Sequence, residues 1–445
     1  MSDVTVLGLG PAACLLALAL ARHGMRPLLL GSRRSRPAVE GVSQRVVEAL
    51  RQSGCSNALD LLGPRWQRVS CWNAQEVEMN GEFVVERSAF DQALLRDVQA
   101  AGIEVKEGLV RSVDPLPEPG RAVAFEHASG RRQTLRAALL ADCRGHTAPK
   151  TAADRLAGHT LVSLGRSFDG ARAQPRTTFI ESFEAGWAWG GVDPAGRAHV
   201  QVVVLPELLA AHDGDLDAAH AACMQMLGRL PRRFGRALQP TGPARARGIQ
   251  PALRGVIAEA DWLRIGDAAY TCDPLSGHGM FEAASAAIAA VPVINTLLRR
   301  PQSSALALRY LDERAESVFR SRIEAAHQHY ATETHWRDEA FWARMTRAPS
   351  LPALQGTRPG RASFASRPVV EDGYIVERRV VVSGEHPRGV RFIDGIDLGR
   401  LDELLHAGAP AAPADIGQHL QAPPEAVARA LHWLQAQSLL THAGH

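Results

Sequence analysis

The first thirty residues contain two short apolar runs separated by a longer segment of helix formers. Residues 4–7 are apolar, glycines follow, residues 11–23 are rich in Ala and Leu, and residues 27–30 are apolar again. Short apolar runs bounded by glycine are typical of buried strands, whereas a longer run of strong helix formers predicts a helix. The order strand, glycine turn, helix, strand predicts the start of a doubly wound α/β domain.

The same pattern returns near the middle of the chain. Residues 262–265 are predicted to form a strand, Gly-Asp-Ala-Ala follows at 266–269, and Asp-Pro-Leu-Ser-Gly-His-Gly occupies 273–279. A run of helix formers then extends from 280 to 290. A second strand, glycine turn and helix is therefore expected here.

Between these segments, β-forming residues alternate or cluster. They occupy residues 177–183 and 198–204, and Gly-Trp-Ala-Trp-Gly-Gly lies between them at 186–191. This pattern predicts a second sheet within residues 155–255. Trp187 and Trp189 are spaced by two, so both rings would point to one face of a strand, either walling a site or filling a core.

The pattern changes again after a loop rich in Pro, Gly and Arg at 349–368. Strands are predicted within 369–382, and helices over 398–407, 413–420 and 424–437, with a short strand at 438–441. Helix, turn, helix and short strand resemble a winged helix. The third helix contains one arginine and one histidine between 423 and 434, too few cations for contacts along a nucleic-acid groove. A protein-docking module is expected, and no nucleic-acid partner.

Composition limits the class of protein. The chain has 445 residues, 46% of them hydrophobic, which is enough for a large core and two or three domains. Its net charge is only +3, and its six cysteines show no paired spacing, which favours a reducing, cytoplasmic setting. The longest apolar stretch, near residues 12–21, is too short to cross a membrane and belongs to the first glycine turn, so no membrane partner is expected.

The first glycine turn has the chemistry of a dinucleotide site. Gly8, Gly10, Pro11, Ala12 and Ala13 form it, and a pyrophosphate can bind the free N–H groups and positive dipole of a helix that starts there. The acidic residue expected at the end of the second strand is missing. Ser32 or Arg33 could instead hold the adenosine side, and an arginine also suits a 2′-phosphate, so this turn leaves FAD and NADP open.

The second glycine turn favours a flavin. Gly266 has no side chain, so a ligand can approach its backbone closely, and the Asp267 carboxylate can accept hydrogen bonds from the hydroxyls of a ribitol chain. The helix entry offers unpaired N–H groups and a partial positive charge to the electron-rich edge of a reduced flavin. The flavin-binding residues expected at this entry are Pro274, Gly277, His278, Gly279 and Met280.

These two turns and three further stretches resemble the flavoprotein monooxygenases of the aromatic hydroxylase fold, on the branch shared with tryptophan halogenases and geranylgeranyl reductases. Residues 85–95 resemble the family's Arg-x-x-Phe-Asp helix start, whose arginine, here Arg87, reaches the cofactor. Residues 140–146 resemble its Asp-Ala-Thr-Gly-Arg segment, with three of five places changed. Residues 40–45 occupy the place of its flavin-side loop, which makes Ser43 and Arg45 candidate flavin ligands.

The resemblance implies an α/β protein with an FAD-binding Rossmann-like domain of the glutathione-reductase type, an inserted β-sheet substrate domain and a C-terminal winged-helix-like domain. We expect the FAD domain at 1–154 and 256–300, the substrate domain at 155–255, a helical region at 301–348 and the docking domain at 360–445. Tryptophan halogenases have Trp-x-Trp-x-Ile-Pro on the substrate sheet and a lysine that directs the halogenating species. Here the tryptophans precede Gly190 and Gly191, and lysine occurs only at 106 and 150. Halogenation is therefore disfavoured.

Oxygen insertion by a flavin-dependent oxidoreductase is the chemistry expected, with O2 as co-substrate. His278 is a candidate proton relay, and Trp187 and Glu181 on the predicted substrate sheet are further catalytic candidates, although a strand carboxylate is usually exposed. No nucleotide fingerprint remains for a second cofactor, so NAD(P)H or reduced flavin would supply electrons from outside.

A halogenase-like body without the lysine, joined to a docking module, resembles the flavoproteins that modify tryptophan during cysteine tryptophylquinone biogenesis. That resemblance implies a monooxygenase that hydroxylates a tryptophan in a partner polypeptide, with two hydroxylations expected. The alternatives are a small-molecule aromatic monooxygenase or halogenase of secondary metabolism, and an isoprenoid reductase.

Overall fold

The computed structural model describes residues 2–34, 38–171, 176–193, 195–235, 238–347, 360–408 and 412–440. The chain divides into two compact units, one of residues 1–290 and 318–352 and the other of residues 291–317 and 353–445. Two long helices, α8 (Gly279–Arg299) and α9 (Ser304–Ala331), each contribute to both units. The predicted boundary at residue 300 and the separate helical region at 301–348 are therefore wrong.

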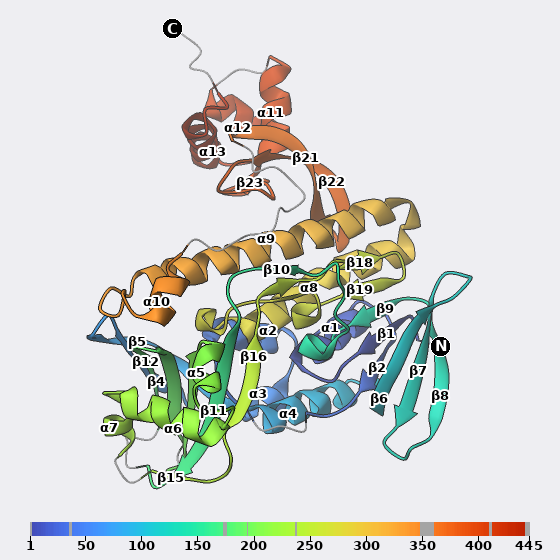
Figure 1. Cartoon of the computed structure of the whole chain (residues 1–445). Coiled ribbons are helices and arrows are strands. Elements are labelled where there is room, and N and C mark those ends of the chain that lie inside the picture. Colours follow the sequence, from blue (N-terminus) through green and yellow to red (C-terminus); the bar gives the residue numbers. More distant parts are fainter. Residues whose placement is uncertain are drawn as a thin grey trace. The chain divides into compact units, whose positions relative to one another are not determined.

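The first sheet of the larger unit has eight strands in the order β18-β19-β9-β1-β2-β6-β7-β8 (Figure 1). Its central strands run parallel, as predicted for a doubly wound fold. The strands of this sheet are β1 (Val4–Leu7), β2 (Pro27–Gly31), β6 (Glu104–Pro115), β7 (Arg121–His127), β8 (Arg132–Ala137), β9 (Leu140–Asp142), β18 (Ala258–Glu259) and β19 (Trp262–Arg264).

Helices and short elements connect this sheet to the rest of the unit. The predicted helix after the first glycine turn is α1 (Pro11–Arg22), and the Arg87 segment begins α4 (Arg87–Ala100). Short 3₁₀ turns lie at 145–147, 266–268, 274–276 and 301–303. The other short elements are α2 (Gln44–Gln52), α3 (Ser56–Asp60), β10 (Arg155–Leu156), β17 (Ala252–Leu253) and β20 (Tyr270–Thr271).

The second sheet has nine strands in the order β15-β11-β14-β13-β12-β4-β5-β3, with β16 also paired to β11. Three of these strands come from before residue 155, so the predicted substrate domain of 155–255 is too narrow. The strands are β3 (Val39–Val42), β4 (Trp66–Trp72), β5 (Gln75–Glu86), β11 (Leu161–Asp169), β12 (Thr177–Phe183), β13 (Gly186–Val192), β14 (Ala198–Val204), β15 (Gln239–Pro240) and β16 (Arg245–Ile249).

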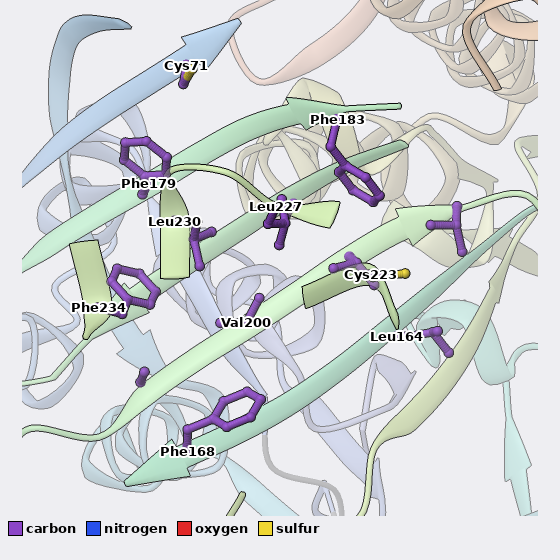
Figure 2. Packing of buried hydrophobic residues seen from close by; sticks show 14 of the residues in the cluster. Cys71, Leu164, Phe168, Phe179, Phe183, Val200, Cys223, Leu227, Leu230 and Phe234 are labelled. Atoms are coloured by element: carbon purple, nitrogen blue, oxygen red, sulfur yellow. The ribbon is translucent and has the colours of Figure 1, made fainter. Parts of the chain in front are cut away.

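The two faces of the second sheet are covered differently. One face packs on α6 (Leu216–Met226) and α7 (Leu230–Phe234), which follow α5 (Pro206–Ala210). Figure 2 shows Phe179 and Val200 of the sheet with Cys223, Leu227 and Phe234 in this core. The opposite face carries Trp187 in a second core that includes residues of α9 and of α10 (Ala340–Met345).

The smaller unit contains a β-hairpin followed by three helices. The hairpin is β21 (Ser363–Glu371) and β22 (Tyr374–Val382), and the short strands β23 (Phe392–Ile393) and β24 (Ile396–Asp397) precede the helices. The helices are α11 (Leu398–His406), α12 (Pro413–Leu420) and α13 (Pro424–Ala436). The three helices were predicted, but residues 438–440 form no strand, and position 441 lies outside the described residues. The strands predicted before the helices form the hairpin, and the short strand predicted after them is absent at 438–440.

Helix α8 changes one expectation drawn from hydropathy. It is 21 residues long with a mean hydropathy of 1.6 in its most apolar window, which meets the length and composition of a membrane span. The prediction that no stretch is long enough is therefore wrong. Because 61% of that window is buried within the protein, α8 has the burial expected of a core helix.

Candidate functional site

Three parallel strands of the first sheet end at one edge. In the register of the sheet, Leu7 of β1 pairs with Asp142 of β9, which pairs with Arg264 of β19. The segments that follow these strands therefore leave the sheet side by side. Both predicted glycine turns are among them, although some 250 residues separate them in the chain.

Two glycines allow these segments to approach one another. Gly8 has φ +118°, and a Cβ there would lie 2.6 Å from the carbonyl oxygen of Cys143. Gly266 has φ +65°, and its Cβ would lie 3.3 Å from the Cβ of Ala12. Only glycine adopts these conformations without strain, so the residue type at both positions follows from the geometry.

The start of α1 fits a dinucleotide pyrophosphate. No heavy atom lies within 4 Å of the position that a Cβ of Gly10 would take, and no side chain caps the helix. Ala12 and Ala13 are buried against the sheet, as the pattern requires for close helix packing. Open space in front of unpaired helix N–H groups is the arrangement that binds phosphate oxygens.

Asp267 fits the hydroxyl groups of the chain that joins a pyrophosphate to a flavin ring. Its half-buried carboxylate accepts no hydrogen bond from any residue in the described part of the chain. Burial raises its pKa, while Arg247 and Arg87 act in the opposite direction. A half-buried acceptor in the field of Arg247, Arg87 and Arg254 can take hydroxyl donors at modest cost.

The flavin-side loop and the start of α4 meet near Asp267. Arg87 is buried, donates to Glu40 at 2.8 Å and forms an ion pair with Asp91 at 3.0 Å. Arg45 of α2 lies over the ring of Phe281 with its guanidinium carbon 5.7 Å from the centroid. Ser43 is the residue before α2, and its side chain makes no capping hydrogen bond. The arrangement brings these predicted flavin ligands to the entry of α8, and their contact with a flavin stays a prediction.

Beside the end of β2, where the adenosine side of the cofactor is expected, lies an acidic residue that the sequence pattern did not indicate. Ser32 and Arg33 are exposed, and Arg33 Nε donates to the Glu107 carboxylate at 2.7 Å. Glu107 lies on β6 as the register partner of Gly31, the position where the acidic residue of the motif was expected. A carboxylate therefore lies beside this position, but it belongs to a residue 76 positions later in the chain.

The entry to α8 is an open turn that begins at a buried aspartate. Pro274 and His278 are half-buried, Gly277 and Gly279 are exposed, and Met280 is buried. Gly277 has φ +61°, and no heavy atom lies within 4 Å of a Cβ placed at Gly277 or Gly279. His278 accepts the N–H of Glu282 at its carbonyl, which makes it the residue before α8, and its ring lies 6.2 Å from that of Phe281. A role for His278 in proton transfer stays a prediction.

A chain of buried hydrogen bonds connects this turn to the second sheet. Asp273 accepts the N–H of Leu275 at 2.9 Å and the hydroxyl of Tyr330 at 3.1 Å. The Tyr330 oxygen in turn accepts the indole N–H of Trp187 at 3.1 Å. Trp187 is 4% exposed and lies in the core with Leu275 and Tyr330. Trp187 is thus linked to the Asp273 turn through Tyr330, and a catalytic role for it stays a prediction.

Burial of Asp273 should make stability depend on pH. Burial raises the pKa of its carboxyl to about 6 from 3.8, so the folded state holds this proton more tightly than the unfolded chain. Its contribution to stability is complete below about pH 4 and is lost as the pH rises to about 6. The unfolding free energy of wild type minus that of Asp273→Asn should fall by up to about 3 kcal/mol over this interval. Urea unfolding at several pH values, with exposed Asp213→Asn as control, measures this difference; a constant difference would contradict it.

Glu181 is a catalytic candidate whose surroundings differ from those expected. It is 4% exposed, and its carboxylate accepts the backbone N–H groups of Gly228, Arg229 and Leu230 at 2.7–3.0 Å. It points to the face of β12 that packs on α6 and α7, where Phe179 and Phe183 also lie. The expectation of an exposed carboxylate was wrong, and Glu181 holds the start of α7 instead of touching a substrate.

The fold and this site define an α/β nucleotide-binding protein with a sheet placed over a flavin-type glycine turn. The tryptophan halogenase family model matches residues 64–359. A structure titled "Peptidyl tryptophan dihydroxylase QhpG essential for tryptophylquinone cofactor biogenesis" is 33% identical, covering 99% of this chain and all of that one, with a TM-score of 0.79. The chain belongs to the tryptophan halogenase family of flavin-dependent oxidoreductases.

Other similarities agree with this fold. The flavin-dependent halogenase CmlS is 17% identical over 98% of this chain and 95% of its own, with a TM-score of 0.76. Digeranylgeranylglycerophospholipid reductase 1 of Methanopyrus kandleri is 25% identical over 73% of this chain and 89% of its own length. The prediction of a mixed α/β flavoprotein on the halogenase and reductase branch is confirmed.

Proposed function

We propose that this protein is an FAD-dependent monooxygenase that hydroxylates a tryptophan side chain within a partner polypeptide, and does so twice, during biogenesis of a tryptophylquinone cofactor. The observation that carries this proposal is the full-length similarity to the peptidyl tryptophan dihydroxylase, which includes the smaller C-terminal unit. A halogenase-like body alone would leave the substrate open, because one fold can serve several chemistries.

The positions of the lysines support hydroxylation over halogenation. Lys106 lies on β6 of the first sheet, where it forms an ion pair with Glu104 at 3.3 Å, and Lys150 is exposed after β9. The chain has no other lysine, so the second sheet carries none. A reaction directed by a lysine ammonium on that sheet therefore lacks its group.

The residues around the two glycine turns would hold FAD. Gly10 and the start of α1 would take the pyrophosphate, Asp267 the ribitol hydroxyls, and the turn at 274–279 the ring. When bound and reduced by NAD(P)H or an external reduced flavin, FAD would supply the activation of O2. The buried core around Trp187 and Leu275 excludes water from one side of this turn, which favours oxygen transfer over wasteful release of peroxide.

The C-terminal unit would recruit the polypeptide. Its core is formed by apolar residues of β22, β24 and the three helices, so it has a hydrophobic core of its own on which a docking surface can be carried.

The six cysteines form no disulfide, which supports a reducing cytoplasmic setting. Neither inference requires a nucleic-acid or membrane partner.

Competition between polypeptide and free tryptophan tests the substrate class. We expect kcat/KM for the unmodified precursor subunit of a tryptophylquinone enzyme to exceed that for free tryptophan by at least about 100-fold, because the docking surface adds binding energy that free tryptophan cannot use. Oxygen consumption and product mass, measured with both substrates in the presence of bromide, give this ratio. Equal turnover of free tryptophan, or a brominated product, would contradict the proposal.

A further inference from the structure

The face of the second sheet that carries Trp187 changes from apolar to polar along its strands. At one end, Leu161, Trp187 and Val203 belong to a core with Leu275 of the α8 entry. Two residues further along the same face lie Trp189 and Gln201, which are paired across β13 and β14. Gln201 also pairs with Gly165 of β11, so Trp189, Gln201 and Gly165 form one row across three strands.

Gln201 is held in one orientation by its neighbour on β11. Its amide nitrogen donates to the hydroxyl of Ser163 at 2.7 Å. Within the described part of the chain, the amide oxygen of the half-buried Gln201 has no hydrogen-bond partner. A fixed amide with a free oxygen is an acceptor available to a ligand.

Gly165 leaves room beside this acceptor. A Cβ placed there would have only the ring of His199 within 4 Å, at 3.7 Å. His199 Nδ1 lies 3.3 Å from the Ser167 hydroxyl, and its ring meets that of Trp189 edge-on with centroids 6.4 Å apart. Burial lowers the pKa of His199 to about 4, so the imidazole is neutral near pH 7. The row is thus bounded by an aromatic wall, a neutral imidazole and one fixed acceptor.

One packing contact and one electrostatic interaction place this row near the second glycine turn. Leu275 packs with Trp187 and Val203. Trp187 lies two residues before Trp189 on β13, and Val203 lies two residues after Gln201 on β14. On β16, Arg247 pairs with Ser163 and acts on the carboxyl of Asp267. Leu275 and Asp267, both of the second glycine turn, therefore lie near the row of Trp189 and Gln201.

We propose that Trp189, Gln201 and His199, arranged over Gly165, form the subsite that binds the indole of the substrate tryptophan. Indole needs flat apolar contact and a single acceptor for its N–H. The Trp189 ring would provide the contact, the Gln201 oxygen would accept the N–H, and His199 would close the side. This assignment rests on the proposed function, since it names where that substrate binds.

Binding of a matched pair of small probes tests the subsite independently of polypeptide turnover. 3-Methylindole has the N–H, and 3-methylbenzofuran replaces it by oxygen. Titration of the FAD-loaded full-length protein, followed by the flavin absorbance, should give roughly tenfold tighter binding of 3-methylindole, which corresponds to about 1.4 kcal/mol for one hydrogen bond.

Gln201→Leu should reduce this preference to about one while the FAD content stays at the wild-type level, because leucine keeps bulk but offers no acceptor. Ser163→Ala keeps the amide but frees its orientation and should reduce the preference partly; it serves as the second variant if Gln201→Leu folds poorly. The control is Gln67→Leu, an exposed glutamine of β4 in the same sheet. No preference in the wild-type protein, or a full preference in Gln201→Leu, would overturn the subsite.

The two proposals can fail separately. If the wild-type protein prefers 3-methylindole and this depends on Gln201, the subsite stands even when no polypeptide is hydroxylated, and the proposed function then falls. If the polypeptide is hydroxylated at equal rates by wild type and Gln201→Leu, the function stands and the subsite is wrong.

Discussion

Replacing Gly10 by valine should abolish retention of FAD while leaving the fold intact. Gly10 has φ −88° and ψ −177°, an extended conformation that valine adopts readily, and the space beyond its Cα is empty to 4 Å. The new side chain would occupy the position where the pyrophosphate must approach the backbone. We expect FAD affinity to fall by about 100-fold or more, or about 3 kcal/mol.

Fluorescence titration of the apoprotein with FAD measures this loss, and thermal unfolding of both apoproteins checks the fold. Gly242→Val is the matched control, since a Cβ at Gly242 also meets nothing within 4 Å, and this glycine belongs to neither glycine turn. Wild-type FAD affinity in Gly10→Val would show that the pyrophosphate binds elsewhere. Equal loss in Gly242→Val would show that the effect is not local.

Replacing Glu181 by alanine should cost stability rather than catalysis. Its carboxylate is the acceptor for three backbone N–H groups at the start of α7, and alanine would remove this acceptor and leave the buried N–H of Leu230 without it. Leaving a buried donor without its partner costs about 1–3 kcal/mol. Chemical denaturation of Glu181→Ala should show this loss, whereas exposed Glu184→Ala should change stability little.

The folded fraction of Glu181→Ala should also keep the wild-type rate of flavin reduction and the wild-type FAD content. The carboxylate points to the face of the sheet that packs on α6 and α7, away from Trp187 and Leu275. A variant with full stability and greatly reduced turnover would restore Glu181 as a catalytic group.

The sequence predicted the parts of the site that are local in the chain. Strand, glycine turn and helix occur within about twenty residues at each turn, because a phosphate site needs only one strand end and one helix start. The motif chemistry therefore identified Gly8, Gly10 and Gly266, and the structure places them together.

Features that depend on distant residues could not be read in this way. Glu107 lies opposite Gly31 but belongs to another strand, and Tyr330 reaches Asp273 across 57 positions. Glu181 occupies a polar position in the alternating pattern of its strand, which is typical of an exposed residue. Its burial is explained only by the backbone N–H groups before α7 that its carboxylate accepts. Strand β4 joins the second sheet by pairing with β12, and β5 then pairs with β4; no local pattern specifies either pairing.

The most direct test of the central claim is mass spectrometry of the precursor subunit of a tryptophylquinone enzyme after incubation with this protein, FAD, NADH with a flavin reductase, and ¹⁸O₂. The account predicts that one and then two ¹⁸O atoms appear on a single tryptophan, with no change when FAD or O2 is omitted. A precursor that stays unmodified while FAD is reduced and reoxidised normally would contradict it.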